Sequence, residues 1–109
     1  MSSFVLTYME EYFEKNKHND FLKNFYNTKY SSLKEEMKKN TPRNFKTKII
    51  VLLKEEILIH TNKKNFSSKE SLIRNFYDSN EVKVLIEMME ICTGIPKKSI
   101  VNEYVDELS

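Results

Sequence analysis

Apolar residues recur along the chain at intervals of three and four, the spacing that places side chains on one side of an α-helix. They do not recur at the alternating interval that is typical of a half-buried strand. Six helices are expected, over residues 3–16, 19–39, 42–61, 67–78, 79–92 and 96–108. The pattern therefore predicts an all-α fold, a compact bundle of five to six helices.

Residues with particular backbone preferences mark several of the expected helix ends. Asn19 and Thr41 are of types whose side chains accept the unpaired N–H groups at the start of a helix. Pro42 suits a first helical turn, because its missing N–H has no partner to lose there. Gly94 can take the left-handed conformation that ends a helix, and Pro96 can open the next helix.

Two stretches are harder to assign. Asn62–Asn65 is polar and predicts a loop, after which Ser67 and Glu70 form a capping box that opens the helix over 67–78. The pattern leaves open whether the helix over 19–39 is interrupted near Thr28–Ser32.

The segment Ile49–Ile59 is unusually apolar, since eight of its eleven residues are Ile, Val or Leu. A helix that is apolar on nearly every side has to lie at the centre of a fold, so the helices over 42–61 and 79–92 are expected to form the interior. The segment also fits two strands, 49–51 and 57–61, around a Lys-Glu-Glu turn. That turn lacks the residues typical of a hairpin, which favours the helix.

Composition indicates one soluble globular domain, because 109 residues with 39% hydrophobic and 31% charged residues suit a single core. The single cysteine, Cys92, cannot form an intramolecular disulfide, and its apolar neighbours predict a buried, inert thiol. The N-terminus reaches Glu10 too soon for a signal peptide, and no apolar run approaches the ~20 residues that span a bilayer. We therefore expect a cytoplasmic protein without membrane contact.

Residues that carry catalysis or metal binding are scarce. No set of His, Cys, Asp and Glu has the spacing of metal ligands, and His18 and His60 stand apart from other candidates. A single glycine excludes a glycine-rich phosphate loop. We expect no enzymatic activity, no metal and no cofactor.

Charge is distributed unevenly although the net value is only +2. Residues 1–37 hold five lysines and six acids, residues 38–74 hold ten basic residues and three acids, and residues 75–109 hold three lysines and seven acids. If the fold keeps the middle cations together, the surface is polarised; otherwise they are solvated helix faces.

The sequence TGIPKKSIVN, Thr93–Asn102, joins a glycine turn to an amphipathic segment. It resembles the turn and second helix of helix-turn-helix DNA-binding proteins, and it is also similar to the two-helix part of ribbon-helix-helix repressors. The first resemblance implies a C-terminal hairpin at 79–108. In that hairpin Lys97 and Lys98 would contact phosphate or guanine, and Asn102 would pair with adenine.

The same segment also has a purely structural interpretation. Glu90 stands where helix-turn-helix units have a small residue, and Glu103 stands where they have an apolar one. Asp106 and Glu107 would repel phosphate. A hairpin that packs the C-terminus onto the bundle explains each of these residues without a ligand.

A second set of basic residues offers a route to nucleic acid without this motif, because clustered cations can follow a phosphate backbone. The set comprises Lys38, Lys39, Arg43, Lys46 and Lys48, joined by Lys63, Lys64 and Lys69.

Two functions are consistent with these patterns. The local signal around Gly94 favours one hypothesis, a small non-enzymatic regulator or accessory protein that binds duplex DNA. Such a protein can act as a monomer or as a homodimer. The alternative is a helical protein-interaction module, such as an inhibitor, immunity factor or adaptor, that docks on an acidic partner protein. A continuous positive strip from Lys97 and Lys98 to Arg43 and Lys63 would support the first.

Overall fold

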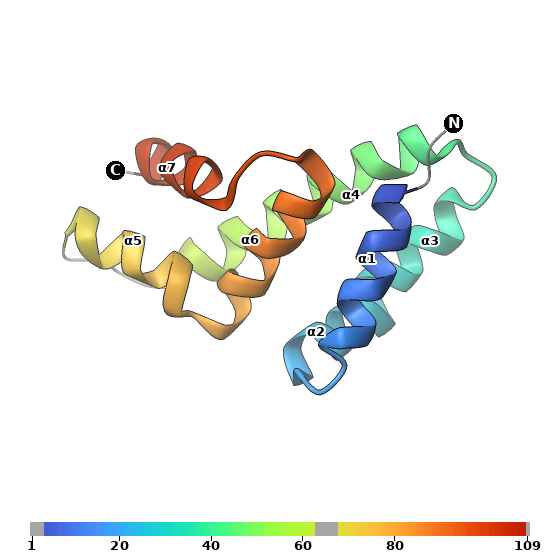
Figure 1. Ribbon diagram of the computed structural model, residues 1–109, viewed down its shortest axis with the longest axis horizontal. Coiled ribbons are helices and arrows are strands. Elements are labelled where there is room, and N and C mark those ends of the chain that lie inside the picture. The colour runs from blue at the N-terminus through green and yellow to red at the C-terminus, as the bar shows by residue number, and fades with distance from the viewer. Residues whose placement is uncertain (1–3, 63–67, 109) are drawn as a thin grey trace.

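The computed structural model describes residues 4–62 and 68–108, and all regular elements in this part of the chain are helices (Figure 1). The elements are α1 (Phe4–Lys15), α2 (Asp20–Phe25), the π-helical segment η1 (Tyr26–Tyr30), α3 (Ser31–Met37), α4 (Pro42–Asn62), α5 (Lys69–Asp78), α6 (Asn80–Thr93) and α7 (Lys97–Leu108). Because α2, η1 and α3 follow one another without a break, the described residues form six continuous helices. The prediction of an all-α bundle is confirmed. None of the described helices is both long and apolar enough to cross a bilayer.

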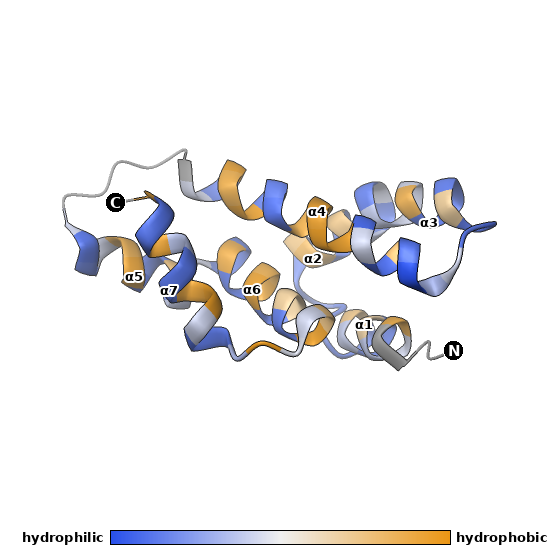
Figure 2. Ribbon diagram, turned by 90° about the horizontal axis from the view of Figure 1, so that it is seen from above, coloured by the Kyte–Doolittle hydropathy of each residue, from blue (hydrophilic) through white to orange (hydrophobic). Residues whose placement is uncertain are grey.

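The helices form two layers, which Figure 2 shows edge-on. One layer contains α3 and α4, and the other contains α1, α5, α6 and α7. Helix α6 lies at the centre and packs against α1, α4, α5 and α7. Its apolar residues nearly encircle the helix axis, as predicted, and seven of them are buried. Burying apolar surface on several sides of one helix is what holds the two layers together.

Helix α4 is continuous from Pro42 to Asn62, so the alternative of two strands in this segment is wrong. The helical period turns Ile49, Leu53 and Ile57 toward the core, where each is at most 1% exposed, and this packing outweighs the strand preference of β-branched residues.

The prediction that α4 is enclosed on nearly every side is also wrong. Val51 is 48% exposed and Ile59 is 44% exposed, on the side of α4 that faces away from α6. Among the described elements, α4 packs mainly on α6, α3 and α1. An edge helix with neighbours on one side leaves its other side open to water.

Helix ends follow the local signals closely. The Asn19 side chain accepts a hydrogen bond from the Leu22 N–H at 3.1 Å, and the Thr41 hydroxyl accepts one from the Asn44 N–H at 3.2 Å. Gly94 ends α6 with a φ of 74°, in the left-handed region. These three predicted ends are confirmed because each depends on a residue type and its immediate neighbours.

The start of α5 differs slightly from expectation. Ser68 is the capping residue, since its hydroxyl accepts a hydrogen bond from the Ser71 N–H at 3.1 Å. Ser67, which we predicted for this role, lies outside the described residues, as does most of the predicted loop 62–65, whose first residue, Asn62, is the last residue of α4.

The open question about the helix over 19–39 is answered by η1, in which the chain widens into a π-helix for five residues. The Ser31 hydroxyl donates to the Tyr26 carbonyl oxygen at 2.6 Å across this segment. The rings of Tyr26 and Tyr30 both pack on Phe13 of α1, with centroids 4.6 and 4.8 Å away. Aromatic contacts therefore fix η1 against the first helix.

Cys92 is buried, as predicted, and is 1% exposed. Its Sγ lies 3.6 Å from Met9 Sδ. Burial raises the pKa of the thiol from 9.0 to about 12, despite an opposing effect of the Lys46 charge. The thiol is therefore protonated at neutral pH, which suits an inert core residue.

Candidate functional site

The C-terminal hairpin consists of α6, the Gly94 turn and α7. Lys97, the first residue of α7, is held by acidic residues of α6. The Lys97 ammonium lies 3.3 Å from a carboxylate oxygen of Glu87. The Lys97 backbone N–H donates to a carboxylate oxygen of Glu90 at 2.8 Å. Glu90, which departs from the helix-turn-helix pattern, therefore places negative charge at the positive end of α7.

Glu87 also connects the hairpin to the first helix. The Tyr12 hydroxyl donates to the other Glu87 oxygen at 2.5 Å. Burial, together with this hydrogen bond and the Glu87 charge, raises the pKa of Tyr12 well above its usual value. One carboxylate thus joins α1, α6 and α7, which gives Lys97 a structural role that needs no ligand.

The exposed side of α7 carries more negative than positive charge. Lys98 and Asn102 are exposed one turn apart, so they share a side of the helix, as the helix-turn-helix resemblance requires. Glu103, Asp106 and Glu107 are also exposed on α7. A phosphate backbone that approached Lys98 along this helix would meet three carboxylates.

Five residues of the second predicted set lie where α3 ends and α4 begins, and we call this set of five the basic corner. Lys46 is half-buried and the other members are exposed. Among the described residues only Lys38 of this set has an ion pair, with exposed Glu35 at 3.0 Å. The basic corner consists of Lys38, Lys39, Arg43, Lys46 and Lys48.

The basic corner and the start of α7 lie apart along the long axis of the molecule (Figures 1 and 2). Lys63 and Lys64, which were predicted to extend the basic set, lie outside the described residues. Lys69 lies on α5, where its ammonium is 3.8 Å from a carboxylate oxygen of Asp106. The described cations therefore form a local corner and not one strip that reaches the hairpin.

The outward side of α4 is a feature that the sequence analysis missed, and we call it the α4 strip. It consists of Lys48, Val51, Glu55 and Ile59, which are all exposed. Their spacing of three and four residues puts them on one side of the helix. The signal was present in the sequence, because polar residues recur on this side of an otherwise apolar segment, but the high apolar count concealed it.

A shallow groove of about 140 Å³ lies beside the same helix, between α4, α6 and α7. Ile95 in the turn is 41% exposed and contributes to its apolar lining. Lys54 of α4 lines the groove, as do Glu103 and Glu107 of α7. The remaining lining residues are Ile50, Met89, Thr93, Ile100 and Tyr104.

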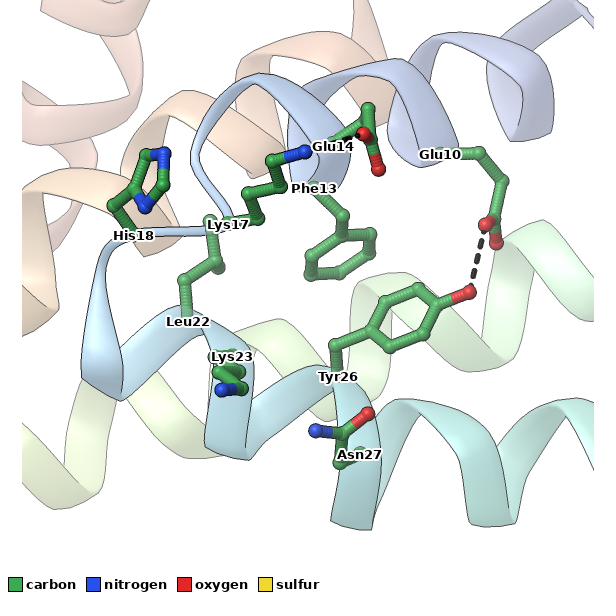
Figure 3. Close-up of a pocket in the computed structure, with 9 residues that line it drawn as sticks. All are labelled: Glu10, Phe13, Glu14, Lys17, His18, Leu22, Lys23, Tyr26 and Asn27. Atoms are coloured by element: carbon green, nitrogen blue, oxygen red, sulfur yellow. Dashed lines mark hydrogen bonds and ion pairs between the residues drawn. The ribbon is translucent and has the colours of Figure 1, made fainter.

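A larger cleft of about 450 Å³ lies between α1 and α2 (Figure 3). Phe13 and Leu22 give it apolar walls, and charged side chains of both signs surround them. The Tyr26 hydroxyl donates to Glu10 at 2.8 Å, and Lys17 pairs with Glu14 at 3.1 Å. Glu10 also pairs with Lys34, so both acidic residues that line the cleft already have basic partners, and the cleft does not define a specific chemistry.

The described residues contain no group of three or more His, Cys, Asp or Glu side chains that is placed to hold a metal ion. The chain matches no family model, no curated protein and no solved structure. The described surface offers two places for a macromolecular ligand, the basic corner and the α4 strip.

Proposed function

We propose that the protein is a non-enzymatic helical protein-interaction module that docks the outward side of α4 on an acidic partner protein. The observation that carries the proposal is the exposure of Val51 and Ile59, 48% and 44%, on a long helix that is buried on its other side. Single exposed aliphatic residues are ordinary on protein surfaces. Two of them on the same side of one helix, beside a groove lined by both apolar and charged side chains, form a surface that a partner helix can cover.

The charges around the α4 strip favour an acidic partner. Helix α4 carries four cations, Arg43, Lys46, Lys48 and Lys54, against the two carboxylates Glu55 and Glu56. Glu56 is buried, which leaves Glu55 as the carboxylate on the exposed side. Complementary charge speeds encounter and selects partners, while apolar contact at the centre of an interface supplies most of the affinity. An acidic amphipathic helix combines both properties.

Binding to duplex DNA is a second candidate, and the basic corner is the specific observation that favours it. Lys39, Arg43 and Lys48 are exposed, and none of them has an acidic partner among residues 4–62 and 68–108. Cations that contact phosphates displace the counterions bound to DNA, and the release of those counterions favours binding whatever the base sequence is. The pairing of Lys97 with Glu87 supports the corner, and not the hairpin, as the contact surface for a DNA-binding accessory protein or regulator.

Fluorescence anisotropy with three labelled probes separates the two functions. The probes are an acidic amphipathic helical peptide, a scrambled peptide of identical composition and a short DNA duplex of random sequence. The protein-interaction proposal predicts that the amphipathic peptide binds more tightly than the scrambled one. Equal binding of the two peptides would reduce the interaction to charge alone. Binding of the duplex without binding of either peptide would replace the proposal by the DNA candidate.

Paired variants assign each interaction to its surface. Replacing Val51 and Ile59 by Gln is expected to weaken binding of the amphipathic peptide at least about tenfold, which corresponds to about 1.4 kcal/mol of binding free energy. Binding of the duplex should not change. Tyr77→Gln, at a residue on α5 that is 40% exposed, is the matched control and is expected to change neither. Replacing Lys39 and Arg43, which belong to the basic corner and not to the α4 strip, by Ala would reduce the salt dependence of duplex binding if the corner contacts phosphate.

A further inference from the structure

A buried carboxylate lies where η1 packs on α4. The Glu56 side chain is 5% exposed, and its two oxygens face two different basic groups. Oε2 accepts a hydrogen bond from the Lys29 ammonium, and Oε1 lies 3.7 Å from His60 Nε2. Buried charge is unfavourable unless it is paired and hydrogen-bonded. The Glu56 carboxylate therefore depends on its two neighbours, and we call Lys29, Glu56 and His60 the trio.

The π-helical segment supplies Lys29 to this trio. Segments of this kind are rare, and they occur frequently at functional sites. Here the widened backbone covers Tyr26–Tyr30, so Lys29 projects from within it. A rare backbone conformation that presents one cation to a buried acid is consistent with a binding site at the same place.

A pocket of about 290 Å³ adjoins the trio. Phe21 and Ile59 line it on the apolar side, and the Phe21 ring meets the His60 ring edge-on with centroids 5.1 Å apart. The polar lining consists of Asn24, Thr28, Lys29, His60 and the little-exposed Glu56. The pocket therefore combines hydrogen-bond donors with apolar walls, the general character of a small-molecule site.

The geometry points to a small organic anion as the ligand: we propose that this pocket binds a short-chain carboxylate between the Lys29 ammonium and the apolar side chains of Phe21 and Ile59. Lys29 is 49% exposed, and an ammonium has three N–H donors, so donors remain after its bond to Glu56. Glu56 also lines the pocket, but its side chain is only 5% exposed and its Oε2 accepts a hydrogen bond from Lys29, so it offers a cationic ligand little accessible carboxylate. This inference does not rest on the docking proposal, although Ile59 belongs both to this pocket and to the α4 strip.

Three probes with the same tail test the charge preference on the full chain. Pentanoate, pentylamine and pentanol are titrated into ¹⁵N-labelled protein, and amide shifts are followed by NMR. Saturable shifts at Phe21, Asn24 and Lys29 are expected with pentanoate and not with the other two. Equal or larger shifts with pentylamine, no saturation, or shifts confined to the Figure 3 cleft around Lys17 and Lys23 would overturn the proposal.

Two substitutions with opposite expected effects sharpen the test. Lys29→Met removes the ammonium and keeps the side-chain stem, so pentanoate should bind at least tenfold more weakly; Lys23→Met, with the same loss of charge at an exposed position of α2, is the control. Glu56→Gln keeps the shape but leaves Lys29 unneutralised, so pentanoate should bind more tightly. If Lys29→Met fails to fold, unchanged or weaker binding to Glu56→Gln alone overturns the proposal.

Discussion

Neighbouring residues of one type have different roles in this protein, as Lys97 and Lys98 show. Lys97 pairs with Glu87, ten residues earlier, whereas Lys98 is exposed. The sequence correctly indicated both as charged residues at a helix start. It did not indicate that Lys97 is paired, because the pairing depends on how α6 and α7 cross. Glu90 was a visible signal, since an acid near a helix start favours that start.

The shared carboxylate of Glu87 predicts a measurable effect on stability. Glu87→Ala removes the hydrogen bond from Tyr12 and the ion pair with Lys97, so the free energy of unfolding should fall by about 1–2 kcal/mol. Glu14→Ala, at a side chain that is 74% exposed and that pairs, within residues 4–62 and 68–108, with Lys17 alone, should change it by less than about 0.5 kcal/mol. Urea unfolding followed by circular dichroism measures both. Equal effects would contradict the structural role of Glu87.

The buried thiol of Cys92 predicts a dependence on alkaline pH. Its pKa is raised from 9.0 to about 12 on folding, so the folded state holds a proton that the unfolded state loses above about pH 9. The contribution of Cys92 to stability is therefore complete below pH 9 and is lost as the pH rises toward 12. Urea titrations at pH 8 to 11 measure the free energy of unfolding. Between pH 8 and 11 this free energy should fall less for Cys92→Ala than for the unsubstituted protein. An identical loss would show that the thiol does not titrate as proposed.

At the scale of the helix, ends were predictable and burial was not. Helix starts and ends depend on residues that act on their own backbone neighbours. Thr41 and Pro42 mark the start of α4, and Gly94 marks the end of α6. Which side of α4 is covered depends on helices that are distant in sequence. The segment η1 was not predictable either, because no residue type in Tyr26–Tyr30 requires a π-helix and its tertiary contacts form only in the fold.

The one-sided burial of α4 predicts a contrast between two aliphatic residues two positions apart. Leu53→Ala removes a side chain that is 0% exposed and should lower the free energy of unfolding by about 2–5 kcal/mol. Val51→Ala truncates a side chain that is 48% exposed and should cost less than about 1 kcal/mol. Thermal unfolding measures the contrast. A large effect at Val51 would mean that another element covers this side of α4.

The turn between α6 and α7 predicts a backbone effect. Gly94 has a φ of 74°, and an added Cβ would have no atom within 4 Å, so strain and not collision is the cost of a side chain there. Gly94→Ala should therefore destabilise the protein by about 1 kcal/mol. Gly94→Asn should cost less, because Asn tolerates the left-handed region better. Chemical denaturation of the two variants checks the order, and a reversed order would contradict it.

At the scale of the whole molecule, charge is divided unevenly among the helices. Helices α1, α6 and α7 each hold more carboxylates than cations, whereas α4 holds more cations. The uneven charge along the chain left open whether the middle cations gather or lie on separate solvated helix faces; the fold places Lys38, Lys39, Arg43, Lys46 and Lys48 where α3 ends and α4 begins. The sequence did not predict that the basic helix would also expose Val51 and Ile59, which adds apolar contact to a charged surface.

The most direct test of the docking proposal is an NMR map of the surface that the acidic amphipathic peptide contacts on ¹⁵N-labelled protein. We predict shifts along the outward side of α4, at Lys48, Val51 and Ile59, that disappear when Val51 and Ile59 are replaced by Gln. Shifts confined to Lys98 and Asn102 on α7, or a peptide that shifts no amide while a DNA duplex shifts those of the basic corner, would contradict it.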